Sequence, residues 1–551
     1  MAVNAAISTP IVAPRGGDSK WRSVVFMEQA SYQATVTRKR LFAFGEPPFP
    51  RGVTGKALQS MQIEHVCEAK VSSIPSSGGL VRIRAHRQSF GKACFLHRES
   101  AYKTQHDTDG KPLMNREPWL GMLNSSRLIW LVLIFAAFVR VGYACRQPNV
   151  EWDASFYRTI AHHLIEGHGY TVDGTTPCTE WAPATPYLLA VVYRLGGGDF
   201  AARMVWVVLG TLAVWAMYGL ASERYSVEVA NLAALGMATY PYNILVGGST
   251  STEIPNILLC LLGLWAALKW CRTGSLACVS AAGVCFGLGI LNRPANAALL
   301  PVVAMAMLLE SKNLNATRKV AGLAVSALCA VAIVLPWCVR TSRETGKINF
   351  VTSCGPMNLW YGMNPWVIPF SEGLMRSTEL TERINAVTRP DMTQAEKDGA
   401  YRQALRRFLH DQTGEALRLL AYKAVRFWAP PGFFKVSTES TIRQVRVAVV
   451  LVGLVCYVPV LLLSIWAVLR VREWRQWRRI WIWVAWITVT FASNVWFTSI
   501  LRYRFAGAVD ALMILLASIV VADHLGKSNT ASTGTALGSS PVNPQMGGRA
   551  F

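Results

Sequence analysis

The sequence contains little charge for its length. Of its 551 residues, 16% are charged and 52% are apolar, whereas roughly a quarter of the residues in an ordinary soluble domain are charged. The mean hydropathy is +0.28. The glycines follow no period of three and the apolar runs follow no heptad, which excludes a collagen-like chain and a coiled coil. The composition is typical of a membrane protein.

Acidic residues are also scarce, since 32 Asp and Glu stand against 55 Lys and Arg, a formal net charge of +23. In a soluble protein this excess would suggest nucleic-acid binding. Membrane proteins collect basic residues in their cytoplasmic loops, which explains the excess without a nucleic acid. We therefore expect no nucleic-acid partner. The 12 cysteines follow no zinc-binding spacing, so no metal site is predicted from them.

Long apolar runs are missing from residues 1–120, which we expect to be a disordered or weakly structured basic extension in the cytoplasm. From residue 128 onward such runs recur. Because a span needs about 20 residues, they predict an all-α polytopic protein with about ten transmembrane helices. The runs cover residues 128–144, 204–221, 229–246, 254–268, 275–291, 295–309, 320–339, 447–469, 480–497 and 505–522.

Basic residues are distributed unequally between the short connections, and this asymmetry predicts the orientation. Connections on one side contain Arg224, Lys269, Lys319 and their neighbours, while the short turns on the other side contain few. The positive-inside rule then places both termini in the cytoplasm. The predicted organisation is a transmembrane module over 121–339, a large outer loop over 340–446, further transmembrane helices over 447–523 and a polar cytoplasmic tail over 524–551.

The two long segments predicted to lie outside contain amphipathic helices. In the first, apolar residues at helical spacing over 153–165 suggest a helix at the membrane interface. Thr185 and Pro186 suggest the start of a second helix through Arg194. His162 and His163 are neighbours on the first helix and therefore point apart, so a metal pair is not expected.

Several motifs resemble a known family when taken in order. They are Glu151 to Tyr157, Glu166 to Tyr170, Trp181 to Tyr187, Asn292-Arg293-Pro294, Asn358 to Pro365 and Arg502-Tyr503-Arg504. This order resembles integral-membrane glycosyltransferases of the GT-C class, in the bacterial branch related to dolichyl-phosphate-mannose protein mannosyltransferases and aminoarabinose transferases. The similarity covers residues 128 to 522.

The resemblance implies an enzyme of the bacterial inner membrane. It would move a sugar from a polyprenyl-phosphate donor to an acceptor on the outer, periplasmic side, with inversion at the anomeric carbon. The acceptor class, whether protein, lipid or glycan, stays open, and membrane lipids are expected partners. The alternative is a polytopic transporter or lipid flippase. Transporters often contain internal repeats with binding groups near the midplane, and no such repeat is visible here.

Asp153 matches the catalytic acid of the family's first loop. A carboxylate within reach of the acceptor hydroxyl can take its proton, although an Asp at a helix start commonly caps free amides. Many relatives have a second, adjacent acid where this chain has Ala154. Glu151 is a candidate substitute, although an offset of two positions points to another helix face. No cofactor is predicted, and a divalent cation at these acids stays open.

Glu253 is a second candidate acid, with a family counterpart. The alternative is structural, because Thr250-Ser251-Thr252-Glu253 fits a capping box before an apolar run.

Four arginines are candidates for binding the donor phosphate: Arg340, Arg293, Arg502 and Arg504. All lie at predicted outer helix ends, where positioned guanidinium groups would stabilise the charge that grows on the leaving phosphate. The alternative is that they only reach lipid headgroups. Asp510 lies inside the last apolar run, so it is a further candidate. Arg502 or Arg504 is its expected partner, and a purely structural ion pair explains it equally well.

Overall fold

The computed structural model describes residues 118–146, 153–248, 250–372, 374–389, 391–430, 450–497 and 508–534. All of them belong to one compact unit. Glu151, Arg502, Arg504 and nearly all of the predicted extension over 1–120 lie outside the described residues, as does the end of the polar tail.

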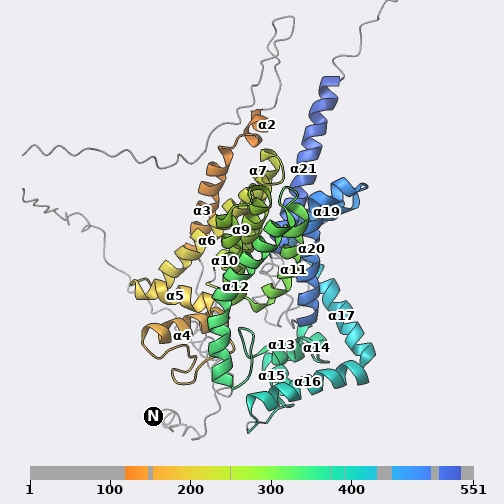
Figure 1. The fold of residues 1–551 in the computed structure, drawn as a ribbon. Coiled ribbons are helices and arrows are strands. Elements are labelled where there is room, and N and C mark those ends of the chain that lie inside the picture. The colour runs from red at the N-terminus through yellow and green to blue at the C-terminus, as the bar shows by residue number, and fades with distance from the viewer. Residues whose placement is uncertain are drawn as a thin grey trace, which may run out of the picture. The chain divides into compact units, whose positions relative to one another are not determined.

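The described part of the chain is helical, and its only β-type pairing is an isolated bridge between Thr171 and Pro177. The all-α prediction is confirmed (Figure 1). The helices are α2 (Pro118–Leu123), α3 (Leu128–Arg146), α4 (Asp153–Ile165), α5 (Ala184–Arg194), α6 (Asp199–Ser222), α7 (Val227–Thr239), α8 (Pro241–Gly247), α9 (Glu253–Thr273), α10 (Leu276–Asn292), η1 (Pro294–Leu299), α11 (Leu300–Glu310), α12 (Ala316–Thr345), α13 (Gly355–Gly362), α14 (Val367–Ser371), α15 (Ser377–Asn385), α16 (Gln394–Asp411), α17 (Thr413–Trp428), η2 (Gly453–Tyr457), α19 (Val458–Leu469), α20 (Trp474–Phe497) and α21 (Val509–Gly534).

Six helices in the described part are long and apolar enough to cross a membrane. They are Leu128–Arg146, Asp199–Ser222, Glu253–Thr273, Ala316–Thr345, Val450–Leu469 and Gln476–Phe497. The other predicted runs also form helices, but two of them are divided or shortened by proline. Pro241 begins α8 after α7 ends, and Pro294 begins η1 after α10, because proline donates no backbone hydrogen bond to a preceding turn.

Small residues allow the long helices to approach closely. A Cβ at Gly283 of α10 would collide with the carbonyl oxygen of Ser326 in α12. In the same way, a Cβ at Gly219 of α6 would lie 2.5 Å from the Trp265 ring of α9. Such contacts between small residues and neighbouring backbone are common where helices pack in membranes.

The predicted cytoplasmic connections meet at one end of the helices. Arg224 lies 3.5 Å from Glu310 and donates a 2.7 Å hydrogen bond to the carbonyl of Arg478. Arg272 pairs with Glu223 at 2.7 Å. These contacts join connections that the sequence predicts to lie on the same side of the membrane. Their assignment to the cytoplasm stays a prediction.

The two long segments lie at the other end of the helices, here called the loop end. Residues 153–198 are called the first loop, and residues 346–430 are called the second loop. Helices α4 and α5 lie there with the last turns of α12 and with α13 to α16 (Figure 1). The second loop has its own apolar core, formed by Trp360, Met363, Tyr401, Leu405 and Phe408 with further residues.

Two local predictions for the first loop are wrong. The apolar face of α4, with Tyr157 and Ala161, was expected to face a membrane interface but is buried against α5 and α6. The periodicity identified a buried face but not what covers it. Helix α5 begins at Ala184, and Thr185 is not its cap, because the Thr185 hydroxyl donates a 2.7 Å hydrogen bond to Asn292 of α10.

Candidate active site at the loop end

Asp153 is the first residue of α4, and its side chain is half-buried. One turn later the Phe156 ring stacks on Trp181 with centroids 5.1 Å apart, and Tyr157 meets the same ring edge-on at 5.5 Å. Residues four apart on a helix share a face, so Asp153 lies on the face that carries Tyr157. The aromatic contacts therefore fix the start of α4 against the Trp181 segment.

Tyr170 joins that segment to the end of α12. Its hydroxyl donates to the carbonyls of Trp181 and Ala182, each at 3.1 Å, and its ring lies 4.7 Å from the Trp337 ring. Burial raises the pKa of Tyr170 well above its ordinary value, and the nearby Arg340 opposes this effect only in part. Tyr170 therefore stays protonated and continues to donate.

Arg340 lies in the last turns of α12, over the same aromatic rings. Its guanidinium carbon is 4.6 Å from the Trp337 centroid and 5.3 Å from that of Tyr170. Nη1 donates a 3.0 Å hydrogen bond to the carbonyl of Cys178 in the first loop. Cation–π contacts of this kind hold a guanidinium in place. Arg340 is thus fixed by contacts with the protein. An arginine that only reached lipid headgroups would not make these contacts.

The second loop is hydrogen-bonded to the first beside Arg340. The amide of Ser353 donates to the carbonyl of Thr179 at 2.9 Å, and the two hydroxyls are 2.8 Å apart. Val351 precedes this contact with φ of 59°, an uncommon conformation for a β-branched residue. Its carbonyl accepts from Trp337 Nε1 at 3.0 Å, so α12 holds the strained residue in place.

Glu253 and Arg293 form an ion pair where α9 begins and α10 ends, at the loop end. Arg293 Nη1 lies 3.4 Å from Glu253 Oε1 and donates to the Thr252 hydroxyl at 2.7 Å. Each side chain is 18% exposed. Glu253 Oε2 is buried and has no hydrogen-bond partner among the described residues. The alternative of a capping box is wrong, because α9 begins at Glu253, which is therefore not the third residue after a Thr250 cap, and no side-chain cap hydrogen bond is formed.

The two candidate acids are placed at the same end by packing between their helices. Tyr157 of α4 shares an apolar cluster with Trp206 of α6 and with Ile254, the residue after Glu253. Asp153 and Glu253 therefore belong to neighbouring helix starts. Among the described residues, no group of three His, Cys, Asp or Glu side chains with metal-ligand spacing includes either acid.

Two charged side chains inside the helical part are buried. Arg140 was not predicted from the sequence, and Asp510 was predicted as a candidate but its contact with Tyr240 was not. Arg140 of α3 is 1% exposed and donates to the carbonyls of Met237 at 3.1 Å and Ala238 at 3.4 Å, near the end of α7. The sequence could have indicated Arg140, because a charged residue inside a long apolar run is rare and often functional. Asp510 is also 1% exposed and accepts a 2.9 Å hydrogen bond from the Tyr240 hydroxyl.

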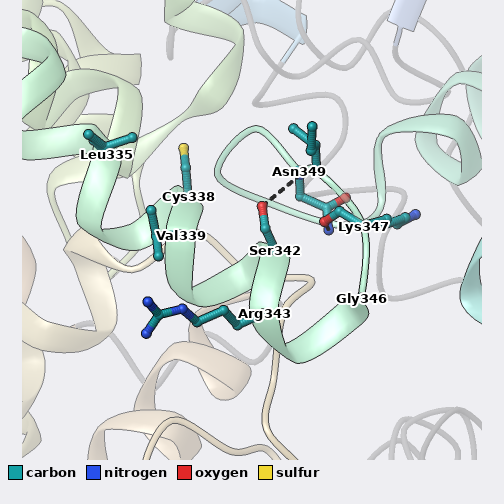
Figure 2. Close-up of a pocket in the computed structure, with 9 residues that line it drawn as sticks. Leu335, Cys338, Val339, Ser342, Arg343, Gly346, Lys347 and Asn349 are labelled. Carbon is teal, nitrogen blue, oxygen red and sulfur yellow. Dashed lines mark hydrogen bonds between the residues drawn. The ribbon is translucent and has the colours of Figure 1, made fainter.

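A groove of about 510 Å³ runs along the last turns of α12 (Figure 2). Its apolar side comes from Leu335, Cys338 and Val339. Its polar side includes Ser342, whose hydroxyl accepts a 2.9 Å hydrogen bond from the amide of Asn349. The groove also contains Arg343, Gly346, Lys347 and Ile348.

Comparison with known proteins finds a family match over part of the chain. Residues 180–337 match the family described as dolichyl-phosphate-mannose-protein mannosyltransferase. No curated protein matches the chain by sequence.

Two solved structures are similar to the chain at low identity. The apo oligosaccharyltransferase of Archaeoglobus fulgidus has 18% identity and a TM-score of 0.45, over 75% of this chain and 52% of that one. This chain thus spans about half the length of that protein. ArnT from Cupriavidus metallidurans, bound to undecaprenyl phosphate, has 14% identity and a TM-score of 0.36, over 78% of this chain and 84% of that one. Over residues 180–337, the chain is therefore similar to the dolichyl-phosphate-mannose-protein mannosyltransferases, as its motifs predict.

Proposed function

We propose that this protein is a membrane glycosyltransferase that moves a sugar from a polyprenyl-phosphate donor to an acceptor on the non-cytoplasmic side of the membrane. The observation that carries the proposal is the fixation of Arg340 on the first loop. Its hydrogen bond to Cys178 places a cation beside the segment against which the Asp153 helix packs. The family match over residues 180–337 supports the reaction class.

The reaction is a single displacement at the anomeric carbon. The acceptor oxygen forms the new bond to this carbon while the bond from the carbon to the donor phosphate oxygen breaks, with inversion. The phosphate leaves with the electron pair of that bond, and the acceptor proton passes to the Asp153 carboxylate. General-base assistance of this type contributes about 10²- to 10⁴-fold to a rate.

Arg340 is the proposed ligand of the leaving phosphate. It makes no ion pair among the described residues, and its single hydrogen bond there uses Nη1. Its charge is therefore not neutralised by a carboxylate in this part of the chain. A fixed cation stabilises the negative charge that develops on the phosphate, because it needs no reorganisation during the reaction. Arg502 and Arg504 are proposed to assist it.

Arg293 and Glu253 have a different proposed role. Arg293 is paired with Glu253, so it offers less net charge to a phosphate than Arg340 does. Glu253 Oε2 is buried and lacks a hydrogen-bond donor among the described residues. A buried acceptor without a donor is costly, and a sugar hydroxyl could supply one. Glu253 is thus proposed to bind the sugar, and Glu151 remains a second candidate acid.

The groove along α12 is proposed to hold lipid. Leu335 and Val339 form an apolar wall on a membrane-spanning helix, while Arg343 lies toward its loop end (Figure 2). This order of apolar and basic groups suits an amphiphile with an anionic head, such as the donor or a membrane phospholipid.

The test uses the purified full chain in proteoliposomes with a radiolabelled polyprenyl-phosphate sugar and a membrane extract as the acceptor source. A transferase moves the label from the donor into a product, and liposomes without the protein do not. A flippase would instead make the donor accessible on the opposite leaflet without consuming it, which would overturn the proposal. A tag near Asn385 tests the side, because access only from the cytoplasm would contradict the orientation.

A further inference from the structure

Three metal-ligating side chains converge where α4 ends in the first loop. One ligand atom each from His163, Glu166 and His168 lies within 4.8 Å of the other two. His168 Nδ1 is 3.6 Å from Glu166 Oε2. No other group of this kind occurs among the residues that the structure describes. The cluster lies ten residues beyond Asp153 on the same helix, about 15 Å along its axis, so it is separate from the candidate active site.

The ring of His163 is oriented by the loop that follows. Its Nδ1 lies 3.0 Å from the carbonyl oxygen of Thr171 and 3.2 Å from the Thr171 hydroxyl. A carbonyl can only accept, so this contact selects the tautomer with the proton on Nδ1 and leaves the Nε2 lone pair for another partner. Metal-binding histidines are commonly oriented by such a hydrogen bond to the nitrogen that does not bind the metal.

The backbone brings His168 back toward His163. The amide of His168 donates to the carbonyl of His163 at 2.9 Å, within a turn that contains Gly167 and Gly169 at φ of 87° and 74°. Both glycines have left-handed conformations that a residue with a side chain rarely adopts.

Gly174 leaves space above the two rings. A Cβ at this position would lie 3.9 Å from His163 Nε2 and 4.0 Å from His168 Nδ1. The two imidazole nitrogens therefore face the same small volume.

We propose that His163, Glu166 and His168 form a binding site for a divalent transition metal, with Zn²⁺ as the best match. Two imidazoles and a carboxylate are typical zinc ligands, and water would complete a tetrahedron. Bonds of about 2.0–2.1 Å require ligand atoms about 3.3 Å apart, so the cluster must contract. The side chains of Glu166 and His168 are 53% and 54% exposed and have room to rotate.

The proposed site pairs His163 with His168, and not with its sequence neighbour His162. The His162 ring stacks on Tyr193 at 4.6 Å, whereas His163 faces Thr171. The two neighbours point apart, as expected from helical geometry. The metal would instead connect the last turn of α4 to the turn that follows it. The inference does not depend on the proposed transferase activity.

Calorimetric titration with ZnCl₂ tests the site directly. The protein is the full chain in detergent, without a histidine tag and after treatment with a chelator. We expect one site per chain in the wild type, and at least a tenfold loss of affinity in His163→Gln and in His168→Gln. His162→Gln is the matched control and should bind as the wild type does. Zinc should also raise the melting temperature of the wild type and of His162→Gln, but not that of His163→Gln.

Two results would overturn the proposal: absence of zinc binding to the wild type, or unchanged binding in the His163→Gln and His168→Gln variants. In either case the 3.6 Å contact between Glu166 and His168 would be a simple ion pair. If a histidine variant fails to fold, Glu166→Gln replaces it, because this exposed side chain can change without disturbing a core. Titration with Co²⁺ gives a second readout: its visible absorption should be present in the wild type and reduced in Glu166→Gln, and equal spectra would contradict the site.

Discussion

The guanidinium of Arg340 lies 4.6 Å from the centre of the Trp337 ring and donates a 3.0 Å hydrogen bond to the carbonyl of Cys178. Trp337 precedes Arg340 by one turn of α12, whereas Cys178 lies 162 residues earlier, in the first loop. The arginine therefore joins the end of a membrane-spanning helix to the loop that contains the proposed base. Its position depends on both contacts.

Replacing Arg340 by lysine should lower the turnover number for sugar transfer at least tenfold. Lysine keeps the charge but lacks the planar group that stacks on aromatic rings and donates in fixed directions. The measurement is steady-state transfer of radiolabelled sugar at saturating donor. Arg418→Lys is the matched control, since Arg418 is an exposed arginine of the second loop that pairs with Glu415 at 3.7 Å. Equal losses in the two variants would contradict the role of Arg340.

The pair of Glu253 and Arg293 should contribute measurable coupling to stability. Its two side chains are each 18% exposed, so solvent screens it less than a surface pair. A double-mutant cycle with Glu253→Gln and Arg293→Gln, measured by unfolding in detergent, should give a coupling energy of about 1 kcal/mol. The exposed pair of Glu379 and Arg383, 43% and 49% exposed, should give at most about 0.5 kcal/mol. Coupling that is no larger in the first pair would refute this expectation.

Lys423 should make the stability of the second loop depend on pH. It is fully buried in α17, where its Nζ donates a 2.9 Å hydrogen bond to the carbonyl of Gly362. Burial lowers its pKa from 10.5 to about 7. Between these values the unfolded chain binds a proton that the folded chain lacks, so stability should rise as the pH rises from about 7 to about 10.5.

Lys423→Met should remove this rise and, since it removes a buried charge at acidic pH, should stabilise the protein most below pH 7. Melting temperatures between pH 6 and pH 9 provide the measurement. Lys312→Met, a change at an exposed lysine, is the control and should keep the pH dependence of the wild type. A slope that persists in Lys423→Met would assign the dependence to other groups.

Gly283→Ala should destabilise the protein by about 1–3 kcal/mol, because the added methyl would collide with the Ser326 carbonyl and separate α10 from α12. Gly142→Ala is the control, since a Cβ at Gly142 of α3 meets nothing within 4 Å. In a helix that change should stabilise by about 0.5–1 kcal/mol. The two variants are compared by thermal unfolding, and a neutral Gly283→Ala would mean that α10 and α12 pack less closely than described.

Apolar periodicity predicted the helices well, because a run of about 20 apolar residues leaves few alternatives to a helix. It also predicted the apolar face of α4 that contains Tyr157, and this residue is buried. It did not predict what covers this face. The face of α4 packs on protein, and the same pattern would suit a membrane interface.

Contacts between distant residues were the least predictable part of the site. Thr250 and Glu253 fit a capping box by spacing, but α9 begins at Glu253, and Arg293, 41 residues after Thr252, donates to the Thr252 hydroxyl. The Tyr240 and Asp510 hydrogen bond joins residues 270 positions apart. Local spacing carries no information on such pairs. Glu151, Arg502 and Arg504 lie outside the described residues, so their roles stay predictions.

The role of Asp153 is tested most directly by sugar transfer in the Asp153→Asn variant. Asp173→Asn is the matched control, because Asp173 is a half-buried carboxylate of the same loop that accepts hydrogen bonds from the amides of Thr175 and Thr176 at 3.0 and 2.7 Å. With both variants folded as judged by size exclusion and melting temperature, Asp153→Asn should lose about 10²- to 10⁴-fold of the transfer rate, and Asp173→Asn should keep it within about twofold. Undiminished transfer by a folded Asp153→Asn protein would contradict the proposed mechanism.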